Sequence, residues 1–350
     1  MEPGKELDTA KMYRVAADKF ILNITFAWEH AVAITDNNDA GKLVSHRFPQ
    51  FSFNPKLKPH FFKYLMLDKK FREHLELSSP GGAGRNRVLK ISDMLKYEIK
   101  LPSIEEQIKI GEYFDSLDHL ITLHQRKCEQ TKKLKKYMLQ KMFPQNGAKV
   151  PEIRFDGFTY DWEQRKLIDY LEVSSEKNRD NRFTKEDVLS VSGEYGIVNQ
   201  IEFQGRSFAG ASVSNYGVVE NGDVVYTKSP LKSNPYGIIK TNKGIPGIVS
   251  TLYAVYKPKE ITDSKFVQIY FELDSRMNSY MHPLVNKGAK NDMKVSAENA
   301  LKGMVSFPKK DEQEMISLYF STLDHLITLH QRKCDELKKM KKYMLQNMFI

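Results

Sequence analysis

The chain has 350 residues, of which 41% are hydrophobic and 28% charged, so it is long enough for two or three domains and is not an intrinsically disordered protein. It has no apolar run of about 18 residues, no signal-peptide core and only two cysteines, and these absences favour a cytoplasmic protein without a membrane span or a disulfide framework. The net charge of +10 favours a polyanionic partner, of which nucleic acid is the commonest.

The N-terminal part of the chain, residues 1–102, has a mixed α and β character. Residues 55–75 have helical periodicity and are followed by a basic, glycine-rich stretch at residues 81–87. Such a loop can approach a phosphate backbone closely and offer hydrogen-bond donors to base edges. The residues expected to contact DNA in this part are Arg85, Asn86, Arg87 and Lys90.

A long helix is predicted next, over residues 104–143. Pro102 precedes Ser103, and Ser103 and Glu106 form a capping-box pattern at its start. Apolar or small residues then recur at spacings of three and four, including Leu134 and Met138, as in a coiled coil. At ~1.5 Å per residue the helix would be about 60 Å long, and a helix with such a narrow apolar stripe needs a partner.

A turn-rich stretch at residues 144–150 leads into a second mixed segment, residues 151–308. β-branched and aromatic runs at residues 218–219, 223–226 and 252–256 predict strands, and residues 262–281 have helical periodicity. Two further basic loops, residues 228–237 and 286–291, contain the remaining residues expected to contact DNA: Lys228, Lys232, Asn234, Tyr236, Lys287, Lys290 and Asn291.

The strongest signal is an internal repeat. Residues 114–143 and 320–349 are identical at 23 of 30 positions, with an offset of 206. A second long helix is therefore expected near the C-terminus, paired with the first in an antiparallel arrangement. The variable part is roughly 100 residues in the first unit and roughly 155 in the second, so the first unit is expected to lack about 55 residues at its front.

Two motifs allow a more specific interpretation, one as a metal site and one as a methyltransferase loop. His119, His124 and Cys128 recur 206 residues later and could bind a metal, but packing of the cysteines in the apolar stripe is favoured, and no metal is expected. Asn234-Pro235-Tyr236 is similar to the Asn-Pro-Pro-Tyr loop of adenine methyltransferases but lacks the second proline. Methyltransferase activity of the chain itself is therefore disfavoured.

Four stretches together resemble the specificity (S) subunits of type I restriction-modification systems. They read LPSIEEQ from Leu101, LDHLITLHQRK from Leu117, KKYMLQKMF from Lys135 and VPEIRFDGFTYDWEQRKL from Val150. The resemblance implies a non-catalytic α+β protein with two target-recognition domains, residues 1–102 and 151–308, joined by a linker at 144–150. Two antiparallel, coiled-coil-like spacer helices, residues 103–143 and 309–350, would separate these domains.

The resemblance also implies the partners. These are double-stranded DNA with a bipartite target, two methyltransferase subunits and, through them, restriction subunits. S-adenosylmethionine would be bound by the methyltransferase subunits only. Residues expected to serve spacing or docking are Leu117, Ile121, Lys132, Lys136, Leu323, Ile327, Lys338 and Lys342, although a solvated face is the simpler interpretation of the lysines. Two alternatives remain open: a truncated interaction protein that reads only one half-site, and a first domain completed by a separate polypeptide.

Overall fold

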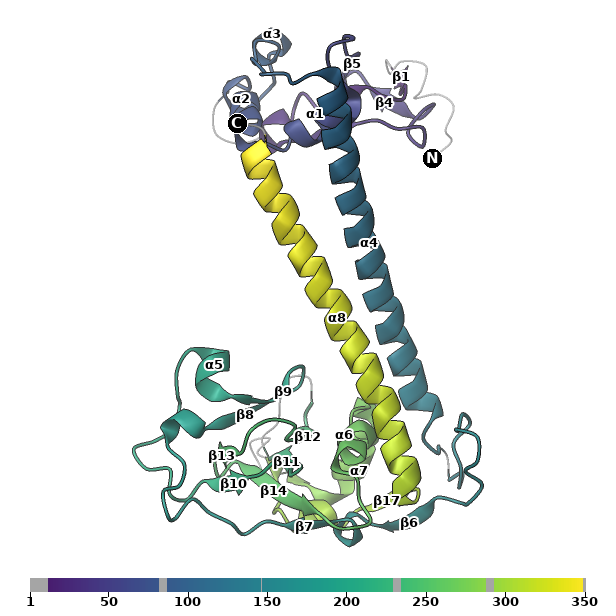
Figure 1. Cartoon of the computed structure of the whole chain (residues 1–350), viewed down its shortest axis with the longest axis vertical. Coiled ribbons are helices and arrows are strands. Elements are labelled where there is room, and N and C mark those ends of the chain that lie inside the picture. The colour runs from purple at the N-terminus through teal and green to yellow at the C-terminus, as the bar shows by residue number, and fades with distance from the viewer. Residues whose placement is uncertain (1–11, 82–86, 146, 229–233, 288–292, 349–350) are drawn as a thin grey trace. The chain divides into compact units, whose positions relative to one another are not determined.

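The computed structural model describes residues 12–81, 87–145, 147–228, 234–287 and 293–348 (Figure 1). The chain divides into two compact units, and both long helices are divided between them. Unit 1 comprises residues 1–128 and 329–350, and unit 2 comprises residues 129–328. Each half of a long helix packs into the core of a different unit.

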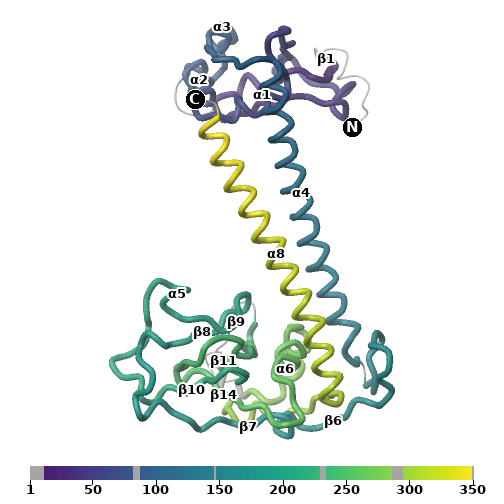
Figure 2. The backbone as a smooth tube through the Cα atoms, in the orientation of Figure 1, coloured from purple at the N-terminus to yellow at the C-terminus, as the bar shows by residue number. Residues whose placement is uncertain are grey.

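The two long helices are α4 (Ile104–Lys141) and α8 (Lys310–Met348), close to the predicted ranges. The Ser103 hydroxyl accepts a hydrogen bond from the backbone N–H of Glu106, as the capping pattern predicts. Within unit 1, Asp118 contacts Lys341 and His124 contacts His330, so the helices run antiparallel (Figure 2). The predicted pairing of the two helices is confirmed. No helix in the described part of the chain has the length and apolarity needed to cross a membrane.

Unit 1 is a small α+β body built on the start of α4 and the end of α8. Its sheets have the strand orders β3-β2-β5 and β1-β4, both antiparallel. Phe20, Phe62 and Phe71 form edge-to-face pairs at its centre and join Phe114 and Leu337 of the long helices in one core. The elements are β1 (Met12–Arg14), β2 (Phe20–Leu22), β3 (Val32–Ile34), β4 (Leu43–Ser45), β5 (Gln50–Phe51), α1 (Pro59–Leu65), α2 (Lys69–Leu77) and α3 (Ile91–Met94).

Unit 2 is larger, and its main sheet is antiparallel with the strand order β12-β11-β14-β7. The three strand predictions are confirmed by β10, β11 and β14. Its helices are α5 (Gln200–Gln204), α6 (Ser264–Tyr270) and α7 (Asp274–Met281). Its strands are β6 (Glu163–Lys166), β7 (Leu171–Val173), β8 (Leu189–Ser192), β9 (Gly196–Asn199), β10 (Gly217–Val219), β11 (Val224–Thr227), β12 (Ile239–Thr241), β13 (Gly247–Val249), β14 (Tyr253–Pro258), β15 (Asn286–Lys287), β16 (Met293–Lys294) and β17 (Met304–Phe307).

Each segment with helical periodicity is two helices rather than one. The breaks fall at equivalent places, residues 66–68 between α1 and α2 and residues 271–273 between α6 and α7. Asp68 starts the second helix of its pair, because its side chain accepts a hydrogen bond from the backbone N–H of Lys70. Periodicity alone does not reveal such a break, since the apolar spacing continues across it.

One buried glutamine in each unit anchors a variable segment to its long helix. Gln107 Oε1 accepts from the backbone N–H of Lys58 at 2.9 Å, and Gln107 Nε2 donates to the carbonyls of Lys56 at 2.9 Å and Pro102 at 3.1 Å. Gln313 makes the equivalent contacts in unit 2, to backbone atoms of residues 261, 263 and 308. The repeat therefore extends from sequence to hydrogen bonding.

Candidate nucleic-acid interface

The paired helices carry the same ion pair twice. In unit 1, Lys341 Nζ lies 2.5 Å from Asp118 Oδ1, and in unit 2, Lys135 Nζ lies 2.6 Å from Asp324 Oδ1. Both residues of one pair are the 206-residue equivalents of those in the other. Each unit thus holds its helices with the same lysine and aspartate, whatever variable segment it carries.

The buried stripe of α4 differs from its prediction in its last turns. Leu134 is 45% exposed, whereas Lys135 and Leu139 are buried. The stripe continues the heptad from Phe114 through Ile121 and Cys128 to Lys135 and Met142, so a lysine occupies a position where an apolar residue is usual. Both cysteines are buried, as the packing interpretation predicts. Among the described residues, no group of three or more His, Cys, Asp or Glu is arranged to hold a metal ion.

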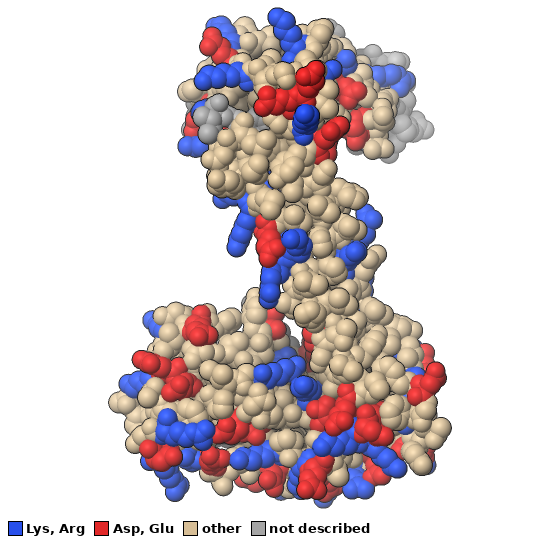
Figure 3. Space-filling model, viewed as in Figure 1, with Lys and Arg blue, Asp and Glu red and all other residues tan. Residues whose placement is uncertain are grey.

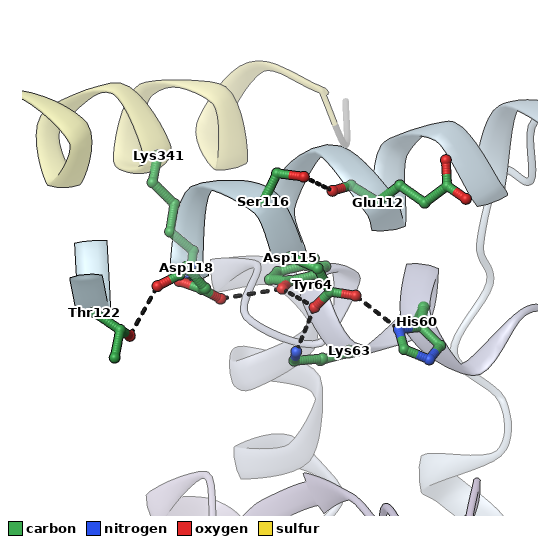
Figure 4. A network of polar contacts seen from close by, with 9 residues as sticks. All are labelled: His60, Lys63, Tyr64, Glu112, Asp115, Ser116, Asp118, Thr122 and Lys341. Atoms are coloured by element: carbon green, nitrogen blue, oxygen red, sulfur yellow. Dashed lines mark hydrogen bonds and ion pairs between the residues drawn. The ribbon is translucent and has the colours of Figure 1, made fainter. Parts of the chain in front are cut away.

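In unit 1 the ion pair belongs to a polar network that joins α1 to α4 (Figure 4). The Tyr64 hydroxyl lies 2.6 Å from Asp115 Oδ1 and 3.0 Å from Asp118 Oδ2, and Lys63 Nζ lies 2.7 Å from Asp115 Oδ1. His60 Nδ1 lies 2.8 Å from the other oxygen of Asp115. Burial alone would raise the pKa of Asp115, but hydrogen bonds from Lys63, Tyr64 and His60 outweigh it and lower the pKa to about 2.

In unit 2 the corresponding place is basic. Lys135 lies between two carboxylates, with Nζ 2.5 Å from Glu272 Oε1 in addition to its contact with Asp324. Burial would lower the pKa of Lys135, but the charges of Glu272 and Asp324 raise it. Lys240 is also buried, and burial lowers its pKa despite the attraction of Glu272. Burial also lowers the pKa of Lys243, although the charges of Asp324 and Glu272 raise it. Three lysines, Lys135, Lys240 and Lys243, therefore interact with the same two carboxylates.

Two cavities flank this lysine cluster, and Asp324 lines both. One, of about 550 Å³, is lined by Lys132, Lys135 and Lys136 of α4. The other, of about 380 Å³, is lined by Lys243, Lys265 and several polar side chains, among them Asn221 and Asn242. Glu272 and Asp274 also line the first cavity. The second cavity, with Lys243 and Lys265 beside asparagine side chains, is the better suited to the phosphate oxygens of a nucleic acid backbone. Lys and Arg side chains also project from the long helices (Figure 3).

The predicted loop residues of unit 1 are partly engaged within the protein. Arg85 and Asn86 lie outside the described residues. Arg87 Nη1 lies 3.3 Å from Glu76 Oε1, and its guanidinium stands over the Trp28 ring at 5.4 Å. Lys90 is exposed just before α3 and leaves a cation available at the surface.

The predicted loop residues of unit 2 are also distributed unevenly. Lys228 is half-buried after β11, and burial followed by the charge of Lys177 lowers its pKa. Asn234 Nδ2 donates to Asp274 Oδ1 at 2.6 Å, and Tyr236 is buried in the core, so its ring does not present a face for stacking on a base. Lys287 belongs to β15, whereas Lys232, Lys290 and Asn291 lie outside the described residues.

The helix residues separate into two groups. The side chains of Leu117, Ile121 and Leu323 are buried and that of Ile327 is half-buried, so these residues build the spacer itself. The lysines are exposed and remain candidates for docking: Lys132, Lys136, Lys338 and Lys342. Sequence reasoning missed Lys240, Lys243 and Lys265, which lie in or beside an Asn-Lys-Gly turn and at the start of α6 and carry no recognisable motif.

In each unit an equivalent glutamine and an equivalent lysine–aspartate pair make the same kinds of contact, although the variable segments differ in sequence. The family model described as the type I restriction modification DNA specificity domain matches residues 5–133. Over these residues the chain is similar to the specificity (S) subunits of type I restriction-modification systems, the family that its sequence motifs resemble.

Three individual proteins are also similar to this chain. A protein of Methanocaldococcus jannaschii named as the type I restriction enzyme MjaX specificity subunit is 22% identical over 99% of this chain and 80% of its own length. The S subunit of the type I system from M. genitalium has a similar fold, with a TM-score of 0.60 at 14% identity over 97% of this chain and 84% of that one. The HsdS subunit from Thermoanaerobacter tengcongensis gives a TM-score of 0.47 at 18% identity over 96% and 81% of the two chains.

Proposed function

We propose that this chain binds double-stranded DNA, reads a bipartite target with its two variable segments, and docks methyltransferase subunits that in turn recruit restriction subunits. The observation that carries the proposal is the repeated frame. Equivalent glutamines and equivalent lysine–aspartate pairs hold two variable segments of different sequence. Two different readers on one frame suit a target with two different halves. Methyl transfer, S-adenosylmethionine binding and cleavage would belong to the partner subunits.

DNA recognition is tested by a gel shift with the matching methyltransferase subunits present. A sequence-preferring complex is expected, with an affinity that falls steeply as the salt concentration rises, because lysines displace counterions from phosphates. A complex that competitor DNA of random sequence removes equally well would contradict sequence-specific recognition.

Docking is proposed for the exposed lysines of the long helices. Replacing Lys132 and Lys136 with glutamate should reduce copurification of the methyltransferase subunits at least tenfold, because it reverses the charge of one helix face. A matched control is Lys309→Glu with Lys310→Glu, which makes the same change of charge at the start of α8. Equal losses in both variants would reject a specific docking face.

The second candidate function is an interaction protein that docks methyltransferase subunits but reads one half-site. It is favoured by the smaller size of unit 1, whose described part holds only short strands and three short helices beside the long ones. Chemical footprinting of the assembled complex separates the two functions. Protection of two half-sites supports bipartite reading, and protection of one supports this alternative.

A further inference from the structure

The start of the long helix in unit 2 is covered by residues 151–173, here called the covering segment. Arg154 of this segment forms a bidentate ion pair with Glu312 of α8, in which both N–O distances are 2.7 Å. Trp162 Nε1 donates to Glu312 Oε1 at 3.3 Å, and β6 pairs along its length with β17. As a result Glu312 is 2% exposed and Phe307, the last residue of β17, is fully buried.

The equivalent place in unit 1 has the acceptor groups without the cover. The offset of 206 places Glu106 on Glu312 and Leu101 on Phe307. Glu106 is exposed, and Leu101 is 41% exposed. Residues 98–101, which correspond to β17, belong to no strand. The same positions are thus shielded in one unit and open in the other.

A cavity of about 390 Å³ marks the open place in unit 1. Its lining includes Leu65, Ile99, Leu101 and Ile110, with Glu106 at one side. Two other acidic residues, Asp68 and Glu98, and two lysines, Lys70 and Lys100, also line the cavity. Glu106 and its apolar neighbours correspond to the side of unit 2 that receives an arginine and an indole ring.

We propose that the start of α4 in unit 1 is an acceptor surface for a second polypeptide that carries a segment like the covering segment. Its arginine would pair with Glu106, an aromatic ring would enter the cavity, and a strand would pair with residues 98–101. The ion pair, the aromatic contact and the strand pairing that the covering segment makes in unit 2 are the contacts that such a polypeptide would make in unit 1. The chain's own covering segment is already engaged, and moving it would leave Glu312 buried without its arginine. The proposal does not depend on DNA binding and can fail separately from it.

The experiment uses a fluorescein-labelled synthetic peptide with the sequence of residues 150–173, titrated with the full chain and followed by fluorescence anisotropy. Saturable binding of one peptide per chain is expected. Glu106→Arg should weaken it at least tenfold, and a peptide carrying Arg154→Glu should restore binding to that variant. The matched control is Glu105→Arg, which changes the charge of an exposed neighbour and should leave the affinity within twofold.

The position of the peptide is tested with a photoreactive benzophenone side chain in place of Trp162. Crosslinks to residues 57–68 or 98–114 support the proposal, and crosslinks to unit 2 overturn it, because they would indicate displacement of the chain's own segment. Absence of saturable binding, or equal losses in the Glu105 and Glu106 variants, overturns it as well. Self-association of the chain that the peptide does not disturb would assign the surface to a second copy. Binding that appears only after removal of residues 1–11 would assign it to the N-terminus of the chain.

Discussion

Lys135 offers the sharpest test of how the helix frame is stabilised. The side chain occupies a heptad position of α4 with only 11% of its surface exposed, and two carboxylates, Glu272 and Asp324, neutralise it. The second oxygen of Glu272 is buried and has no hydrogen-bond partner among the described residues, so this carboxylate relies on the lysine. Lys135→Met keeps the packing volume but leaves both carboxylates without their cation.

The expected cost follows from burial. Removing one partner of a fully buried ion pair costs ~3–5 kcal/mol. Asp324 is 41% exposed and can regain hydration, so we expect a loss of about 2–3 kcal/mol in the free energy of unfolding of unit 2. Lys136→Met is the matched control, because Lys136 is exposed on the same turn and its replacement should cost less than ~0.5 kcal/mol.

The measurement is urea unfolding followed by tryptophan fluorescence. The chain has two tryptophans, Trp28 in unit 1 and Trp162 in the core of unit 2. A Trp28→Phe background therefore reports on unit 2 alone. A double-mutant cycle of Lys135→Met with Asp324→Asn should give a coupling energy of about 1 kcal/mol or more. Equal stability of the Lys135→Met and Lys136→Met proteins would refute the view that a buried cation holds this part of the frame.

Three further predictions concern other parts of the molecule. Gln313→Ala should destabilise unit 2 by about 2–4 kcal/mol in the same assay, because it leaves buried backbone groups without hydrogen bonds. Gln200→Ala is the control, and it should cost less because Gln200 is more exposed. Asp115 has a pKa of about 2 when folded against 3.8 normally, so its stabilisation is present above pH 3.8 and is lost as the pH falls toward 2. Asp115→Asn should remove that loss, about 1 kcal/mol after allowance for solvent screening, in unfolding experiments at graded pH. Lys243→Gln should lower the salt dependence of DNA binding by about one counterion, and Lys149→Gln, a linker lysine paired with Asp161, should not.

The repeat made the helix frame predictable, because two near-identical stretches with one apolar stripe need each other as partners. Strands rich in β-branched residues, such as Val224 to Tyr226, were predictable for the same local reason. The burial of Lys135 was not predictable, because it depends on an ion pair with Glu272, which is far away in the sequence. The surroundings of the side chains proposed to contact DNA were the least predictable. Tyr236 and Arg87 were expected to contact DNA because they belong to basic loops. In the structure, Tyr236 is buried in a core, and Arg87 contacts Glu76 and Trp28.

The glutamine anchors have a consequence for how such a protein can change. Gln107 and Gln313 contact the variable segments only through backbone N–H and carbonyl groups, which every residue except proline provides in full. A variable segment can therefore be replaced by another of unrelated side chains, provided that its backbone follows the same path beside the long helix. The frame thus permits a change of specificity without a change of architecture.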